Sequence, residues 1–151
     1  PEIAPAERPP LLDVARKWGI AVEWCGADEL PGAYGSYQID GSMIRLATYD
    51  EDVFFHELAH AADHRLRGEI SGGQHLDQEV VAEVSAAVLA RIYGCRSECE
   101  GRCWAYVGKY CKAADKAAGQ VIAGLLKRID AVLSAIIGEV ENGTQGEEAA
   151  G

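Results

Sequence analysis

The segment FFHELAHAADH, residues 54–64, has three histidines, each separated from the next by three residues, with a glutamate directly after the first. In an α-helix, side chains four residues apart lie on one face, so His56 and His60 can direct two imidazole nitrogens at one ion. Neutral imidazoles are good zinc ligands, and Glu57 is placed to take a proton from a water that the metal has acidified. The spacing therefore predicts a hydrolytic metal centre of the H-E-x-x-H type.

The same three residues would also fit a polar helix face that is simply solvated. The neighbouring residues argue against this interpretation, because most are apolar and would bury several sides of the helix. Buried histidines and a buried glutamate need polar partners, so a metal-binding role is favoured. The apolar neighbours are Val53, Phe54, Phe55, Leu58, Ala59, Ala61 and Ala62.

A catalytic zinc ion takes three protein ligands and one water, so the third ligand is expected outside this helix. The next predicted helix has Glu79 and Glu83 on one face, four residues apart. We assign Glu79 as the ligand and Glu83 as the carboxylate that accepts an N–H from a ligand imidazole, and the reverse assignment stays open. His64 shares the face of His56 and His60, and we interpret it as a substrate contact, a hydrogen-bond partner behind the ligands, or a helix-end cation.

The apolar pattern predicts a small sheet before the histidine helix. Residues 11–18 have helical spacing, and IAVEW, residues 20–24, alternates as a strand does. Two strand-like runs within residues 33–47 flank Asp40-Gly41, a dipeptide that suits a tight hairpin turn. We therefore expect a short helix, a strand and a β-hairpin.

Three longer helices are predicted after the hairpin. Thr48 and Glu51 fit a capping box, in which a hydroxyl and a carboxylate each bind a free backbone N–H at a helix start. The histidine helix is expected to stop at Gly68, where a glycine-rich loop begins. This order of elements predicts an α+β fold. The helices are expected at about residues 50–67, 77–93 and 117–137.

Length and composition indicate one soluble domain. The 151 residues suffice for one core, and we expect an extended lead-in at 1–10, the domain at 11–138 and a disordered acidic tail at 139–151. The formal charge of −10 disfavours nucleic acid and acidic membrane surfaces as partners. No apolar run approaches the roughly 20 residues that span a bilayer. The first residues lack signal-peptide features, so we expect a cytoplasmic protein.

Four of the five cysteines lie in one short segment, at Cys95, Cys99, Cys103 and Cys111. Thiolates bind zinc well, and three of these side chains would share a face if the segment were helical. The spacing differs from the usual C-x2-C pair, so reduced, half-buried thiols are favoured over a second metal site.

Together these motifs resemble those of known metallopeptidases of the zincin group, of the gluzincin kind. The stretches KWGIAVEW, LPGAYGSYQIDGSMIRL and FFHELAHAADH, followed by EVVAEVSAAVLA, are similar to ImmA/IrrE peptidases. FHELAHAADH and QEVVAEVSAAVLA also resemble the metallopeptidase domain of ArdC-type antirestriction proteins. The likeness covers about residues 11–110 and is more specific for fold and metal than for substrate.

The resemblance implies a zincin-like fold, in which a small twisted sheet with a hairpin packs on the H-E-x-x-H helix, a glutamate-bearing helix follows, and further helices lie C-terminally. It places Glu79 at the ligand glutamate, and Glu83 where ImmA/IrrE peptidases usually have asparagine. Glu83 and His64 both match the ArdC pattern. ArdC-like proteins usually carry a separate domain that binds single-stranded DNA, and nothing in this sequence matches it. DNA binding and antirestriction activity are therefore not carried over.

We therefore expect a zinc-dependent endopeptidase that acts on a protein or peptide, with Glu57 as general base. The strand MIRLA is expected to be the exposed edge that pairs with an extended peptide. The alternative is a non-enzymatic module that uses zinc for folding and binds a regulatory or antirestriction partner. A donor for the oxyanion is also needed. The sequence leaves five candidates: Tyr34, Tyr93, Tyr106, His64 and His75.

Overall fold

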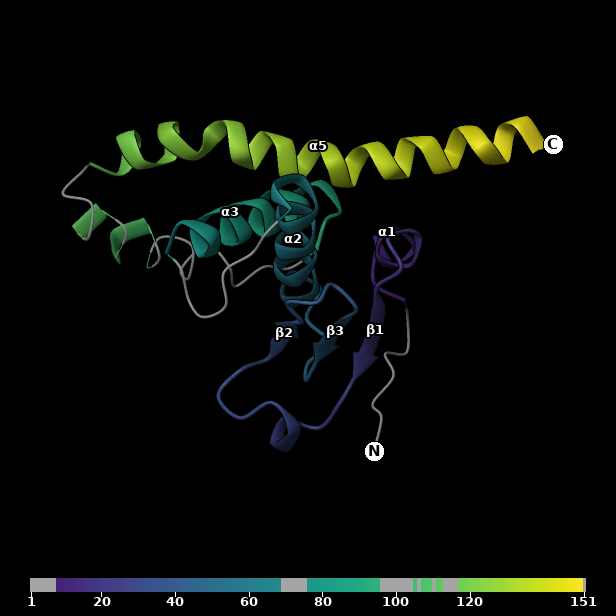
Figure 1. Ribbon diagram of the computed structural model, residues 1–151, viewed down its shortest axis with the longest axis horizontal. Helices are drawn as coiled ribbons and strands as arrows, with labels where there is room; N and C mark the ends of the chain where they lie inside the picture. Colours follow the sequence, from purple (N-terminus) through teal and green to yellow (C-terminus); the bar gives the residue numbers. More distant parts are fainter. Residues whose placement is uncertain are drawn as a thin grey trace.

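The structure is a computed structural model with a mixed α+β fold, in which several helices accompany a three-stranded sheet (Figure 1). It describes residues 8–68, 76–95, 105, 107–109, 111–112 and 117–150. The elements are α1 (Leu12–Lys17), β1 (Ala21–Trp24), the 3-10 helix η1 (Ala27–Glu29), β2 (Gly35–Tyr37), β3 (Met43–Leu46), α2 (Glu51–Arg67), α3 (Leu76–Ile92) and α5 (Ala118–Ala150).

The predicted hairpin is confirmed, with β2 and β3 antiparallel and Gly41 in the left-handed region at φ 77°. The predicted edge strand is wrong. The strand order is β1-β3-β2, so β3, the MIRLA segment, is central, with β1 parallel to it on its other side. Ile44 and Leu46 explain this position, because both are almost fully buried and a central strand is better covered. The sheet edges are β1 and β2.

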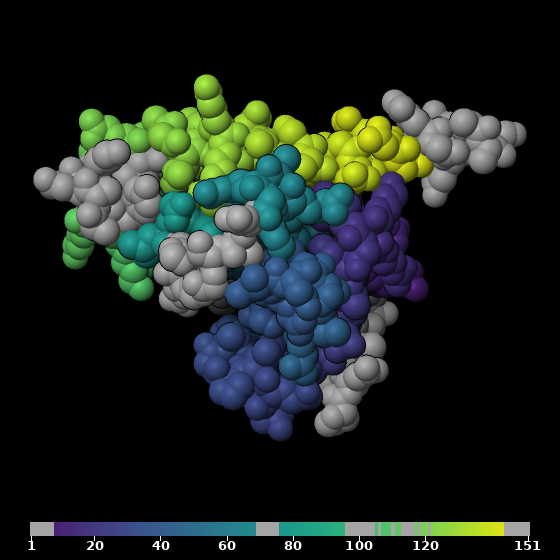
Figure 2. Space-filling model, in the orientation of Figure 1, coloured from purple at the N-terminus to yellow at the C-terminus, as the bar shows by residue number. Residues whose placement is uncertain are grey.

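Helix α2 lies between the sheet and α5, and it forms the middle of the core (Figure 1). Its side chains Phe54, Phe55 and Leu58 are almost fully buried. From the other side α5 contributes Val132 and Ile136, which are also fully buried. Figure 2 shows the strands and the loop between β1 and β2 as a lobe below the helices. One helix therefore carries much of the core packing and two of the three predicted metal ligands, His56 and His60.

The predicted end of α2 is confirmed, but its start differs in detail. Gly68 has φ 76°, and its N–H donates to the His64 carbonyl at 2.8 Å, as expected of a left-handed helix cap. The predicted capping box is absent, because the helix begins at Glu51, which places that residue in the first position and not the third. Thr48 instead accepts a hydrogen bond from the Asp50 N–H at 3.2 Å.

Helix α5 extends through the segment predicted to be a disordered tail, since it continues past Glu139 to Ala150. The Lys17 ammonium donates to the Glu139 carbonyl at 2.9 Å and so joins α1 to α5. Gly143 allows this approach, because a Cβ there would lie 2.6 Å from Lys17 Nζ. The predicted lead-in at 1–10 lies mostly outside the described residues. Within the described ranges, no helix combines the length and apolar character needed to cross a bilayer.

A partly buried arginine joins α5 to both of the helices that carry the predicted ligands. Arg128 Nε donates to Asp63 Oδ1 of α2 at 2.8 Å, and Arg128 Nη1 donates to Asp77 Oδ2 of α3 at 2.8 Å. Its Nη2 adds a second hydrogen bond to the Asp63 carboxylate. Asp63 is only 2% exposed. The paired geometry satisfies a carboxylate that would otherwise be buried without a partner.

We predict that Arg128→Met lowers the free energy of unfolding by about 3 kcal/mol, because it leaves the Asp63 carboxylate buried and unpaired. Lys127→Met on the same helix is the matched control and should change it by less than about 0.5 kcal/mol, since Lys127 is exposed. Urea unfolding of the two variants measures the difference. Equal stabilities would contradict the structural role of Arg128.

Candidate metal centre

Helices α2 and α3 pack side by side and bring three of the predicted site residues together. The Nε2 atoms of His56 and His60 lie 3.0 Å apart. Glu79 spans both imidazoles, with Oε2 at 3.2 Å from His56 Nε2 and Oε1 at 3.3 Å from His60 Nε2. Each residue offers one ligand atom, and these atoms all lie within 4.8 Å of one another. The structure thus places the predicted ligand set, His56, His60 and Glu79, around one point.

These distances suit a tetrahedral ion. Zinc bonds of about 2 Å at tetrahedral angles separate neighbouring ligand atoms by roughly 3.3 Å. The contacts between the imidazoles and the Glu79 carboxylate have this size. Two imidazole nitrogens and one carboxylate oxygen are also a donor set that zinc accepts, with one position left for water. The residues therefore fit a catalytic-type zinc site.

Small residues on α3 allow the two helices to approach closely. Ala82 and Ala86 are buried to 1% and 0% exposure, and helical spacing places them next to Glu79 and Glu83. A larger side chain there would hold the carboxylates away from the histidines. The sequence thus positions the acidic residues through the small residues between them.

Glu83 contacts the His56 ring on the side away from the other two predicted ligands. Its Oε1 is 3.0 Å from His56 Nδ1, and the residue is 5% exposed. The two atoms are at hydrogen-bonding distance, although the ring N–H does not point directly at the oxygen. This contact lies on the opposite side of the ring from Nε2, so Glu83 orients His56 while Glu79 faces the ion position. The placement favours Glu79 over Glu83 as the ligand.

The carboxylates determine the charge of the metal-free centre. Burial lowers the pKa of His56, but Glu79 and Glu83 outweigh it and raise that pKa to about 10. Burial alone would raise the pKa of Glu79, whereas the two imidazoles lower it well below its usual range. At neutral pH the metal-free centre therefore contains a protonated His56 beside an ionised Glu79.

Glu57 lies beside this group with its carboxylate close to strand β2. It is 8% exposed, and burial raises its pKa. A Cβ at Gly35 would lie 3.1 Å from both Glu57 Cγ and Oε1, and 2.8 Å from Val53 Cγ1. Gly35 therefore lets the edge strand approach the predicted general base. This residue was not among those singled out from sequence, although an isolated glycine within a strand signals a close backbone approach.

His64 does not join the ligand group. Its Nδ1 lies 2.8 Å from the Tyr37 hydroxyl of β2. Of the other oxyanion candidates, Tyr34 is 65% exposed and Tyr93 packs on Phe55 with ring centroids 6.2 Å apart. His75 and Tyr106 lie outside the described residues. The structure thus places His64 against the edge strand, where it meets a partner that was not predicted from sequence.

The predicted cysteine group lies partly outside the described residues, which exclude Cys99 and Cys103. Cys95 is half-buried, and burial raises the pKa of its thiol. Cys111 is also half-buried and free. The favoured interpretation of this group as reduced thiols therefore stays a prediction.

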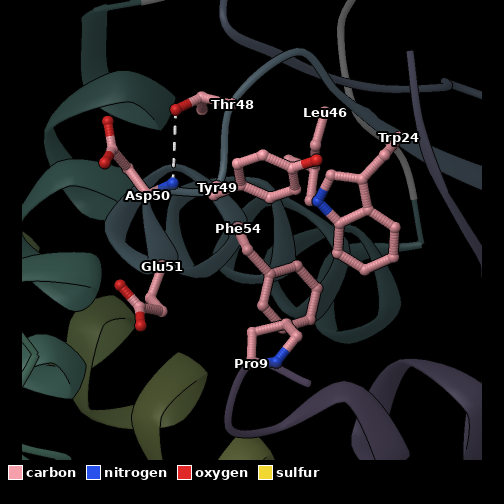
Figure 3. A pocket seen from close by; sticks show the side chains of 8 residues that line it. All are labelled: Pro9, Trp24, Leu46, Thr48, Tyr49, Asp50, Glu51 and Phe54. Carbon is pink, nitrogen blue, oxygen red and sulfur yellow. Dashed lines mark hydrogen bonds between the residues drawn. The ribbon is translucent and has the colours of Figure 1, made fainter. Parts of the chain in front are cut away.

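Two hollows in the described part of the chain lie away from the predicted ligand side chains. The hollow in Figure 3 lies between the loop that precedes α2 and the ends of β1 and β3, and holds about 20 Å³. A wider hollow separates the end of α2 from α5 and is lined by Trp18, Arg65, Leu66, Ala135 and Glu139. Neither contains a predicted ligand. The first is lined by Pro9, Trp24, Leu46, Thr48, Tyr49, Asp50, Glu51 and Phe54.

No protein-family model, curated protein or solved structure matches this chain. The candidate centre is therefore supported by the geometry and chemistry of its own residues.

We predict that zinc binding at pH 7 releases about one proton, because a ligand imidazole must be neutral and the pKa of His56 is about 10 without metal. His56 loses its proton as pH rises, so the apparent zinc affinity should increase about tenfold per pH unit between roughly pH 7 and 9. Titration calorimetry in buffers of different ionisation enthalpy measures the proton count. Glu83→Gln removes one carboxylate beside His56 and should release fewer protons. An affinity that does not depend on pH would contradict a protonated His56 in the metal-free centre.

Proposed function

We propose that this chain is a zinc-dependent peptidase of the zincin-like type that hydrolyses peptide bonds in a protein or peptide substrate. One observation carries the proposal: His56, His60 and Glu79 converge within 4.8 Å, and Glu57 lies beside them, following the first histidine on the same helix. When bound, zinc would act as a Lewis acid that polarises a carbonyl and lowers the pKa of a water.

Glu57 would move the protons. A buried carboxyl whose pKa is raised toward neutrality can accept a proton readily and return it to a leaving amine. His56 and His60 hold their rings on one helix, and Glu83 fixes the orientation of the first ring. These side chains are therefore arranged to bind the ion, keep it in place and transfer a proton next to it.

Strand β2 would bind the substrate. The Ala47 N–H donates to the Tyr34 carbonyl, and the Gln38 N–H donates to the Met43 carbonyl. In an antiparallel pair such bonds recur at alternate residues, so the backbone groups of Gly35 and Tyr37 point away from β3. An extended peptide could pair with this edge, next to Glu57. This assigns to β2 the role that was expected of β3 from sequence.

A purely structural zinc site is less well supported. Structural zinc sites usually have four protein ligands, whereas the described residues supply three to this group. A structural site would also have no use for the buried Glu57 beside the three predicted ligands. The non-enzymatic module remains the alternative outcome of the experiments below.

We predict that Glu57→Gln reduces peptide hydrolysis by at least about a hundredfold and leaves the zinc content unchanged, because the amide cannot accept a proton. The measurement is cleavage of a mixture of unstructured peptides by the zinc-loaded protein, detected by mass spectrometry, with zinc measured separately. Glu51→Gln, at the start of the same helix, is the control and should retain activity. Cleavage by Glu57→Gln at the wild-type rate would refute the assigned role. A zinc-loaded wild type that cleaves no peptide would favour the non-enzymatic module.

Gly35→Ala should also reduce hydrolysis, by about tenfold or more, while zinc stays bound. The added Cβ would lie within 3.1 Å of the Glu57 side chain and must displace that side chain or the strand, and a shift of about 1 Å is enough to misalign a base. Gly119→Ala is the matched control, since a Cβ there meets no atom within 4 Å. The same peptide assay compares them. Full activity of Gly35→Ala would show that this approach has no role.

A further inference from the structure

Tyr37 and His64 join the edge strand to the metal-ligating helix. The Tyr37 hydroxyl lies 2.8 Å from His64 Nδ1, and the two rings meet edge to face with centroids 5.9 Å apart. His64 lies one helical turn beyond His60, on the same face of α2. Since His64 is not one of the three converging ligands, the contact needs another explanation.

The hairpin turn closes over this pair. Gly41 has φ +77°, and a Cβ there would lie 3.2 Å from the Tyr37 hydroxyl oxygen and 3.8 Å from His64 Cε1. The turn, the strand and the helix therefore meet at one hydrogen bond. The side chains of Tyr37 and His64 therefore have little room to move apart.

The backbone N–H and C=O of Tyr37 also point outward along the free edge of β2. Its side chain and the position of a Gly35 side chain lie on the same face of β2, because side chains alternate along a strand. Gly35 touches the helix at Glu57, and Tyr37 touches it at His64. These two contacts, about 7 Å apart along the strand, fix how β2 lies along α2.

We propose that the Tyr37–His64 hydrogen bond is a positioning contact. It holds the free edge of β2 at the position along α2 where a bound peptide would pass the metal centre. The inference rests on the proposed function and adds to it the residues that set substrate position. Strand β2 is only three residues long, and the Tyr37 hydroxyl is one of the points at which it meets α2. Without the hydroxyl, the strand can tilt while the ligands on α2 and α3 keep their geometry.

The test compares two metal-binding probes on the zinc-loaded protein. Acetohydroxamate contacts the metal alone, whereas an N-acetyl tripeptide hydroxamate also pairs with the strand edge. We expect Tyr37→Phe to weaken binding of the tripeptide hydroxamate about five- to tenfold, the size of one lost hydrogen bond. Binding of acetohydroxamate should not change. His64→Gln should act in the same direction.

Ser36→Ala is the matched control, since its side chain lies on the opposite face of β2 and both affinities should stay at the wild-type level. Zinc content and the thermal midpoint show that each variant is folded, and His64→Gln gives the same comparison if Tyr37→Phe does not fold. An unchanged tripeptide affinity, or an equal loss for both probes, would overturn the inference. So would a wild type that binds the tripeptide probe no better than acetohydroxamate.

The same experiment separates this inference from the proposed function. Selective loss of the tripeptide probe in a protein that cleaves no peptide would support the positioning contact and refute hydrolysis. A wild type that binds neither probe would refute both the metal centre and the contact.

Discussion

The close packing of α2 against α3 is the constraint on which the rest of this structure depends. It places two imidazoles and a carboxylate within 4.8 Å of one another in a largely buried setting. Without metal, that arrangement is tolerable because His56 gains a proton and Glu79 stays ionised, so the charges compensate. A metal ion in place of this proton would keep the attraction to the Glu79 carboxylate and would add bonds to the two imidazoles. These side chains are thus close enough to hold a metal ion without rearrangement.

The sheet and α5 maintain this arrangement from two sides. The sheet covers one side of α2 through Ile44 and Leu46, and α5 covers another. Arg128 links the two ligand-bearing helices through a single guanidinium group, which resists their separation. The hairpin completes the surroundings by carrying a glycine next to Glu57. Rigid supports of this kind are what a site needs if its side chains are to keep their positions through a reaction.

The features that were predictable from sequence are local ones. Residues four apart share a helix face, which brings His56 and His60 together. Glycines with positive φ mark the hairpin turn and the end of α2. Among the features that depend on distant segments, the approach of Glu79 to the two histidines was predicted, but the order of the strands and the partner of His64 were not. The parallel pairing of β1 with β3 makes the expected edge strand central, and Tyr37 meets His64 across 27 residues. The predicted capping box is absent for a local reason, because the residue before the helix is Asp50 and not Thr48, so Glu51 is the first helical residue.

The contacts of Arg128 also bear on the order in which the chain acquires its structure during synthesis. Its carboxylate partners precede it by 65 and 51 residues, so both leave the ribosome well before it does. Until Arg128 is synthesised, the Asp63 carboxylate lacks this guanidinium partner. The link that Arg128 makes between α2 and α3 is then also missing. A metal ion that arrived early would meet ligands on two loosely associated helices. In a zinc-binding chain of this design, the late arginine would make capture of the ion one of the last events in maturation.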